Sequence, residues 1–109
     1  MAEKYLVGVD MGTGSVRVGI YRLDGHEVGF AVTEYNTYHA HPGWAEQKPE
    51  DWWNCLQNSM KKALARSGVD KKDIIAIGYD VTACSVLLCK KDGTPLRDCL
   101  LWMDVRSYK

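Results

Sequence analysis

Residues 9–21 read VDMGTGSVRVGIY and place a glycine-rich segment between two apolar ones. Asp10 precedes the glycines and Arg17 follows them. In residues 15–22, SVRVGIYR, apolar side chains recur at every second position, which is the period of a β-strand with one buried face. Residues 5–10, YLVGVD, form a short apolar run that is typical of a strand buried on both faces. The glycine-rich segment is therefore predicted to join strand to strand.

This segment differs from the two best-known phosphate-binding loops, which run from a strand into a helix. It lacks the G-x-x-x-x-G-K-[ST] spacing, and Arg17 stands where G-x-G-x-x-G requires its third glycine. A hairpin can still bind an anion if successive backbone N–H groups surround it. Gly12 and Gly14 permit the positive φ values that such a curl requires. Thr13 and Ser15 add hydroxyl donors, so the segment has the groups needed to hold a phosphate.

Asp10 carries a charge that would repel a bound phosphate. A divalent cation between the two removes the conflict, because hard cations bind carboxylate, water and phosphate oxygens together. The alternative is a plain hairpin turn, in which Asp10 and Thr13 form only local side-chain hydrogen bonds. Both interpretations stay open for this segment taken alone.

The rest of the chain alternates between strand, loop and helix patterns. Asp24 and Gly25 predict a hairpin turn, and residues 27–35 then read as a third strand, so the first three strands form an antiparallel meander. A loop follows, and Pro49 begins an amphipathic helix that ends at Gly68.

The helix and the segments after it complete the predicted elements. Trp53 is assigned to the apolar face of the helix and to the core. Residues 73–81 and 85–90 are predicted to form further strands, and residues 99–104 begin another element. The sequence thus predicts a mixed α/β fold.

Composition limits the classes of function. The chain has 109 residues, enough for about one domain, and a formal net charge of zero. No dense run of Lys and Arg points to a nucleic acid or a membrane surface. The apolar runs are shorter than the roughly 18 to 20 residues that span a bilayer, and no signal-peptide pattern is present, so a cytoplasmic protein is expected. The four cysteines show no C-x-x-C pair and are expected to be reduced, and the H-x-H pair His39 and His41 lacks a third metal ligand.

Three segments together resemble one protein family. The pattern D-x-G-T-x-S-x-R at residues 10–17 is similar to the first phosphate loop of the actin-like ATPase superfamily, and specifically of the FGGY carbohydrate kinases. Residues 41–53, HPGWAEQKPEDWW, resemble the family's G-W-x-E-Q-x-P-x-x-W-W segment, and residues 75–106 resemble its second and third strand motifs. The resemblance implies an α/β fold of the actin-like ATPase (ribonuclease H-like) class, with a mixed sheet, an antiparallel three-strand meander and at least one packed helix. Residues 1–109 are expected to be the N-terminal part of the family's N-terminal domain, with the rest of that domain and the C-terminal domain absent.

The resemblance also implies an activity, the transfer of the γ-phosphoryl group of ATP to a small sugar with Mg²⁺ as cofactor. The general base, an aspartate, is expected downstream of Lys109, so the fragment alone is expected to be inactive. Residues 79–88, YDVTACSVLL, are closer to ribulokinases than to glycerol kinases, which carry Asn-Gln-Arg-Glu there, or xylulokinases, which carry Gly-Gln-x-His. A pentulose such as ribulose is the expected substrate, although Val105 replaces a histidine that related pentulose kinases often have.

Residue roles follow where positions match the family's motifs. Asp10 would bind the magnesium of MgATP, usually through water, and Arg17 would counter the phosphate charge. The phosphate path would be lined by Gly12, Thr13, Gly14 and Ser15. Sugar contacts are implied for Thr82, Ala83, Cys84, Trp102, Asp104 and Arg106. The alternative for Trp102 is a core residue, since it follows Leu100 and Leu101, and a cysteine such as Cys84 serves packing more often than chemistry. Trp44 and Glu46 are expected to anchor a loop.

Two other classes of function remain open. One is a non-catalytic binding module that keeps the actin-like fold and binds a ligand without turnover. The other is a chaperone or cytoskeletal actin-like ATPase, which would share the first loop but not the GWAEQ and LWMDVR segments. A sugar is the only partner predicted, and the oligomeric state is left open between a monomer and a homo-oligomer that pairs at an exposed sheet edge.

Overall fold

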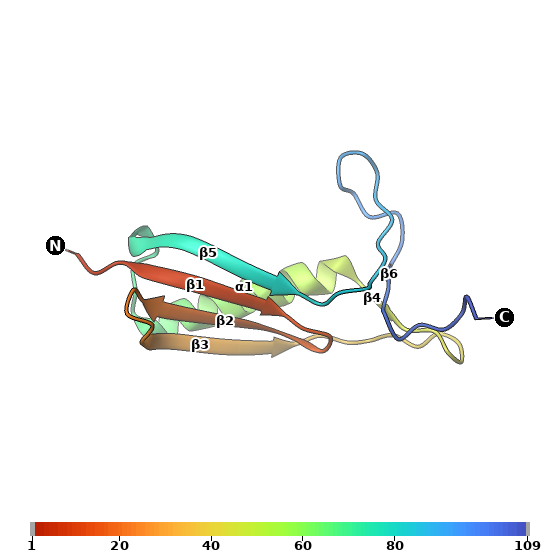
Figure 1. Cartoon of the computed structure of the whole chain (residues 1–109), viewed down its shortest axis with the longest axis horizontal. Coiled ribbons are helices and arrows are strands. Elements are labelled where there is room, and N and C mark those ends of the chain that lie inside the picture. Colours follow the sequence, from red (N-terminus) through yellow and green to blue (C-terminus); the bar gives the residue numbers. More distant parts are fainter. Residues whose placement is uncertain (1, 109) are drawn as a thin grey trace.

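A four-stranded mixed sheet with one long helix across one face forms the body of the molecule (Figure 1). The computed structural model describes residues 2–108. The strands lie in the order β3-β2-β1-β5. Their bounds are Tyr5–Met11 for β1, Ser15–Arg22 for β2, Glu27–Glu34 for β3 and Ile74–Val81 for β5.

The topology of the sheet confirms the predicted fold class. β1, β2 and β3 form an antiparallel meander, and β5 pairs in parallel with β1. The connection from β3 to β5 passes through helix α1, Pro49–Ser67, and the short 3₁₀ helix η1, Lys71–Asp73. Because parallel strands need a crossover, the helix both makes the connection and covers the sheet.

The core lies between α1 and one face of the sheet. Val16, Val18 and Ile20 of β2 are fully buried there, as their two-residue period predicts. The prediction that β1 is buried on both faces is wrong, because Leu6 and Gly8 are exposed on the face that no helix covers. An apolar run of this length does not reveal how many of its faces will be covered.

Helix α1 begins and ends where the sequence predicts. Pro49 occupies the first turn, and Gly68 caps the C-terminus in the left-handed conformation, with φ of 68°. The assignment of Trp53 to the core is wrong, because 59% of this residue is exposed. Trp52 instead faces the interior, and this turns Trp53 toward the uncovered side of the helix beside β5. No helix among the described residues is long and apolar enough to cross a membrane.

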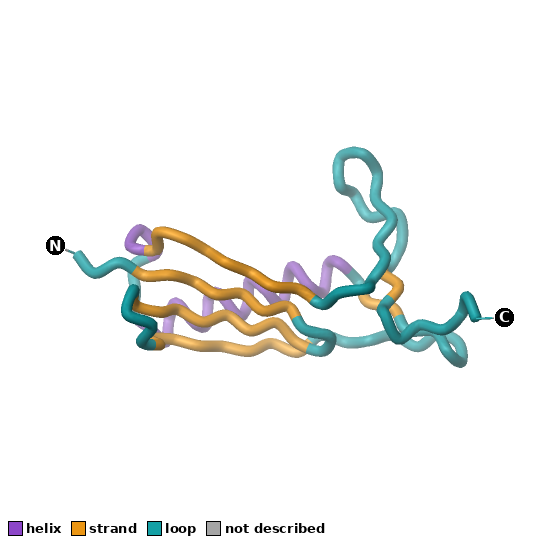
Figure 2. Tube along the Cα trace, in the orientation of Figure 1, coloured by secondary structure: helices purple, strands orange, loops and turns teal. Residues whose placement is uncertain are grey.

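A second, smaller unit lies beyond the end of the sheet (Figure 2). Its two strands, β4 at Glu46–Gln47 and β6 at Cys99–Leu100, pair antiparallel. The predicted strand at residues 85–90 is wrong, since this segment forms only isolated bridges, through Val86 and Cys89. No strand lies beside this segment for long enough to form a ladder, so the segment is a loop with two isolated bridges.

Candidate functional site

The turn between β1 and β2 consists of residues 12–14, and we call it the phosphate turn after its predicted role. It is closed by the Gly12 N–H, which donates to the Ser15 carbonyl at 2.9 Å. Tyr35 holds it from the side, because its N–H donates to the Gly14 carbonyl at 3.1 Å and its hydroxyl donates to the Gly12 carbonyl. The turn is therefore fixed by contacts from outside the hairpin.

The two glycines of the phosphate turn do not adopt the backbone conformation that was predicted for them. Positive φ was expected at Gly12 and Gly14, but neither glycine adopts it. Space is the constraint at Gly12, where a Cβ atom would lie 3.1 Å from Nη1 of Arg17. A Cβ atom at Gly14 would have no neighbour within 4 Å. Gly12 thus leaves room for the guanidinium group, whereas Gly14 stands in open space.

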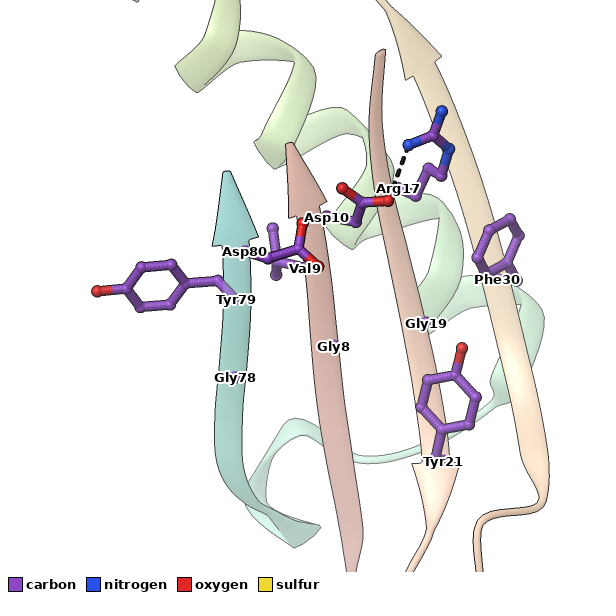
Figure 3. A pocket seen from close by; sticks show the side chains of 10 residues that line it. All are labelled: Gly8, Val9, Asp10, Arg17, Gly19, Tyr21, Phe30, Gly78, Tyr79 and Asp80. Carbon is purple, nitrogen blue, oxygen red and sulfur yellow. Dashed lines mark hydrogen bonds and ion pairs between the residues drawn. The ribbon is translucent and has the colours of Figure 1, made fainter. Parts of the chain in front are cut away.

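Asp10 and Arg17 form an ion pair across the two strands that flank the turn. They are register partners, and Nη1 of Arg17 lies 2.8 Å from Oδ2 of Asp10 (Figure 3). Both side chains are a little under half exposed. The pair thus presents a carboxylate and a guanidinium group together at the open face of the sheet.

Asp80 joins this pair, although the sequence analysis did not single it out. It is the register partner of Asp10 on the parallel strand β5. The interaction between the two neighbouring carboxyl groups raises the pKa of Asp80 and lowers the pKa of Asp10, and the neighbouring Arg17 lowers that of Asp10 further. The signal was available, since each of the two parallel strands carries an aspartate one residue before its last position.

These three charged groups line a shallow hollow of about 480 Å³ on the open face (Figure 3). Its floor consists of Gly8, Gly19 and Gly78, which are register partners on three neighbouring strands. The backbone is exposed at Gly8 and Gly78, whereas the Tyr21 side chain covers Gly19. The charged end of the hollow points toward the phosphate turn.

The Thr13 hydroxyl joins the phosphate turn to two residues predicted to contact the sugar. Nε1 of Trp102 donates to Oγ1 of Thr13 at 3.2 Å, and Oγ1 of Thr82 lies 3.5 Å from the same atom. The predicted nucleotide and sugar residues thus meet at one hydroxyl group, although 69 and 89 positions separate them in the chain. The Trp102 ring is 56% exposed, so it is not a core residue.

The other predicted sugar residues fall into two groups. Ala83 and Cys84 directly follow Thr82, at the end of β5, and both are exposed. Cys84 has a φ of 58°, in the left-handed region that residues other than glycine rarely adopt. Together the two residues form a sharp turn with small side chains beside the phosphate turn.

Asp104 and Arg106 contact each other and the loop before α1. Nη2 of Arg106 lies 2.6 Å from Asp104 and 3.0 Å from Glu46, and the guanidinium carbon stacks 3.7 Å above the Trp44 ring. Oδ2 of Asp104 also accepts from the Ala45 N–H at 2.7 Å. We call this group the Asp104 brace; its members are Trp44, Glu46, Asp104 and Arg106. The expected loop anchoring by Trp44 and Glu46 takes place through it.

The brace holds a strongly acidic carboxyl group. The hydrogen bonds from Arg106 bring the pKa of Asp104 far below its usual range, and the Ala45 N–H adds to the effect. The same bonds raise the pKa of Arg106. Among residues 2–108, no hydrogen bond or ion pair joins the side chain of Asp104 or Arg106 to the phosphate turn, so a role in binding sugar stays a prediction for both.

His39 and His41 contact Trp44 instead of each other. Nδ1 of His39 lies 2.7 Å from the Trp44 carbonyl, and the His41 ring meets the Trp44 ring edge to face. Within residues 2–108, no group of three or more His, Cys, Asp or Glu side chains is placed to hold a metal ion. A cation at Asp10 would therefore need oxygen ligands from water and phosphate.

The chain matches one protein family over almost all of its length. Residues 5–109 match the N-terminal domain of the FGGY family of carbohydrate kinases. A glycerol kinase of Sulfolobus acidocaldarius is 30% identical over 108 residues, and a ribulokinase of Geobacillus thermodenitrificans is 35% identical over 107 residues. These alignments cover 98% and 88% of this chain but 22% and 19% of the two relatives.

A solved structure gives the same result for the fold. A protein described as a xyloylose kinase, from Brucella ovis, superimposes with a TM-score of 0.90 at 30% identity, over 95% of this chain and 22% of its own. The chain thus spans about a fifth of the length of the relatives that it matches. With the sheet order, the phosphate turn and these matches taken together, the chain belongs to the FGGY family of carbohydrate kinases.

Proposed function

We propose that a protein containing this chain transfers the γ-phosphoryl group of ATP to a hydroxyl group of a small sugar, and that the sugar is a pentulose such as ribulose. The observation that carries the proposal is the Thr13 hydroxyl, which lies 3.2 Å from the Trp102 indole and 3.5 Å from Thr82. Phosphoryl transfer requires the phosphate and the accepting hydroxyl to lie side by side. Thr13 provides that proximity between the two proposed half-sites.

On the nucleotide side, the residues present fit a magnesium phosphate. Asp10 offers a half-exposed carboxylate, the kind of hard oxygen ligand that Mg²⁺ prefers, and water can complete its shell. Arg17, already beside Asp10, would balance the phosphate charge, and the turn residues Gly12, Thr13, Gly14 and Ser15 would line the phosphate path. Magnesium would supply charge neutralisation, while these residues would orient the phosphate.

On the sugar side, the turn after β5 favours a pentulose over glycerol. Ala83 and Cys84 are small and offer few hydrogen-bond partners, so they leave space for a larger substrate. The exposed ring of Trp102 offers an apolar surface to the carbon chain of that substrate. Glycerol would leave its hydroxyl groups poorly paired in this space, and a site discriminates strongly against poor pairing.

The remaining parts of the proposed site lie outside this chain. We place the general base, an aspartate, and the adenine pocket in the part of the relatives that extends past residue 109. The 109-residue chain by itself is therefore expected to form no ADP in a sugar-dependent way.

A substrate panel tests the proposal. A protein that carries this chain at the full length of its relatives is assayed for ADP formation with ketopentoses, pentitols and glycerol. We expect kcat/KM for ribulose or a related pentulose to exceed that for glycerol by about tenfold or more, which corresponds to roughly 1.4 kcal/mol. Glycerol as the best substrate would exclude the pentulose assignment. ATP binding without turnover of any sugar would instead support a non-catalytic binding module.

A further inference from the structure

Gln47 is the most completely buried polar side chain beside the phosphate turn, with 1% of its surface exposed. It lies in β4, away from the main sheet, yet its amide touches three other parts of the chain. Nε2 donates to the Thr13 carbonyl at 2.5 Å and to Oγ1 of Thr37 at 3.0 Å. Oε1 accepts from Nε1 of Trp52 at 2.9 Å. Every polar atom of the amide therefore has a partner.

The chemistry of these partners fixes the orientation of the amide. A backbone carbonyl can only accept a hydrogen bond, and an indole N–H can only donate one. The nitrogen of Gln47 must therefore face Thr13, and its oxygen must face Trp52. If the amide were rotated by 180°, its oxygen would face the Thr13 carbonyl oxygen and its nitrogen would face the Trp52 indole N–H, and neither pair could form a hydrogen bond. The side chain is thus held in a single arrangement.

This arrangement makes Gln47 a link between α1 and the phosphate turn. Thr13 receives the Gln47 amide at its carbonyl and the Trp102 indole at its hydroxyl. The backbone of β4 meanwhile pairs with β6, where Gln47 is the register partner of Cys99, three residues before Trp102. A displacement of the Thr13 carbonyl would therefore also displace the hydroxyl that Trp102 contacts.

We propose that Gln47 is a positioning residue: its amide fixes the Thr13 carbonyl and so sets the contact between the phosphate turn and Trp102. Its importance for turnover rests on the proposed function, but the contact itself does not. Gln47 is 1% exposed and all the polar atoms of its amide are paired, so it offers no free group to a substrate and its effect passes through Thr13. Its amide is buried and fully paired, whereas Gly14 in the turn itself is exposed.

The indole N–H signals of the ¹⁵N-labelled 109-residue chain test this proposal. Its four tryptophans give one such signal each. In Gln47→Met, which keeps a similar volume but loses the amide, we expect the signals of both Trp52 and Trp102 to move. The matched control is Gln57→Met on the exposed surface of α1, which should leave both in place.

The signal of Trp102 decides between the outcomes, because the Trp102 indole donates to Thr13 and not to Gln47. A shift of the Trp52 signal alone would overturn the proposal, since Gln47 would then join only β4 and α1. A shift of both signals beyond the spread of the control supports it. The Trp102 signal is assigned with Thr13→Val, which removes its acceptor.

A second variant covers the case in which Gln47→Met does not fold. Trp52→Phe removes one hydrogen bond of the amide and keeps an aromatic ring, so the amide is free to turn. We expect the Trp102 signal to move in this variant as well. An unchanged Trp102 signal, or a loss of folding in both variants, would overturn the proposal, because Gln47 would then serve the fold and not the turn. These signals report a contact, so they decide the matter even if no sugar is phosphorylated.

Discussion

At the scale of single residues, three charged side chains lie on adjacent strands beside the phosphate turn. Asp10 forms an ion pair with Arg17 at 2.8 Å, and the neighbouring carboxyl group of Asp80 also acts on its pKa. A bound magnesium phosphate would meet one cation and two carboxyl groups, of which Asp80 has the raised pKa and Asp10 the lowered one. Asp10 is therefore the carboxyl group that stays ionised more readily and is better suited to a cation.

Gly12→Val tests whether the space at the turn matters. The added side chain would begin 3.1 Å from Arg17 Nη1 and displace the guanidinium group from Asp10. A misplacement of about 1 Å in a catalytic site can cost on the order of 10²-fold in rate, so we expect a comparable fall in kcat/KM for ATP in the full-length protein. Ala65→Val is the control, because it adds an apolar side chain at an exposed position of α1 outside the proposed site. Equal losses in both variants would contradict this account.

Asp104→Asn tests the brace through the pH dependence of stability. The folded state holds the pKa of Asp104 below the unfolded value of about 3.9, so the group stabilises the fold above that pH and loses this effect as the pH falls. We expect the Tm difference between wild type and Asp104→Asn to be largest near neutral pH and to shrink below about pH 4. Thermal melts across this range measure it, with Asp98→Asn as the control outside the brace. A Tm difference that stays constant with pH would be inconsistent with an ionised brace.

At the scale of elements, α1 packs closely against β3 at Gly29. A Cβ atom on Gly29 would lie 2.6 Å from the Ala63 carbonyl oxygen and 2.7 Å from the Ser67 Cβ. These neighbours are a helix backbone atom and the first side-chain atom of a helical residue, so neither can move without the helix. The packing distance between helix and sheet thus depends on glycine at position 29, which has no side chain.

Gly29→Ala should therefore separate the helix from the strand. We expect a loss of about 1 to 3 kcal/mol in the free energy of unfolding, which is typical of an overpacked core. Gly78→Ala in β5 is the control, since no atom lies within 4 Å of its Cβ position, and a change within about 0.5 kcal/mol is expected there. Urea unfolding of both variants provides the measurement. A tolerated Gly29→Ala would show that the helix is loosely placed.

Local patterns predicted the elements that local chemistry determines. The period of β2, the proline at the start of α1 and the glycine at its end all act within a few residues, and the structure confirms each of them. Whether Trp53 is buried depends instead on which elements cover that face of α1, and whether residues 85–90 form a strand depends on a partner strand. No local sequence pattern encodes either of these. The strand-like apolar spacing at 85–90 was present without a partner strand.

The candidate site shows the same division. The family motif located the phosphate turn and Trp102, and the fold brings them together at the Thr13 hydroxyl. Asp80 and Gln47 were missed, because their importance arises from register and burial and not from spacing along the chain. A comparison of the two aspartate-bearing strand ends could have found Asp80, whereas the burial of Gln47 had no signal of that kind.

At the scale of the whole molecule, β3 and β5 are the two edge strands of the sheet formed by residues 2–108. β5 is the apolar edge, since it presents Ile75, Ile77, Tyr79 and Val81 to solvent. Beside it lies an apolar groove of about 530 Å³ that includes Trp53, Leu56 and Met60 of α1. An exposed, apolar edge strand is a template for pairing with another chain.

Ile77→Lys tests self-association of the 109-residue chain at this edge. We expect the chain to associate as its concentration rises, through β5 of two copies, and the charged variant to remain monomeric. Leu23→Lys is the matched control, because Leu23 is 58% exposed and Ile77 57%, but Leu23 lies in the turn before β3. Analytical ultracentrifugation over a concentration series measures the effect. A monomeric wild-type chain, or the same result for both variants, would exclude association through β5.

The central claim is that the turn after β1 positions a magnesium phosphate for transfer to a sugar. Sugar-dependent ADP formation by the full-length protein, with Asp10→Ala compared with the wild type over a range of Mg²⁺ concentrations, tests it most directly. We expect kcat to fall on the order of 10²-fold, since the carboxylate proposed to hold the magnesium of the transferring phosphate is lost, and to recover in part as Mg²⁺ is raised. Asp24→Ala, at the opposite end of the sheet, should leave the rate unchanged. An Asp10→Ala rate equal to that of wild type at every Mg²⁺ concentration would contradict the claim and leave the turn as a plain hairpin.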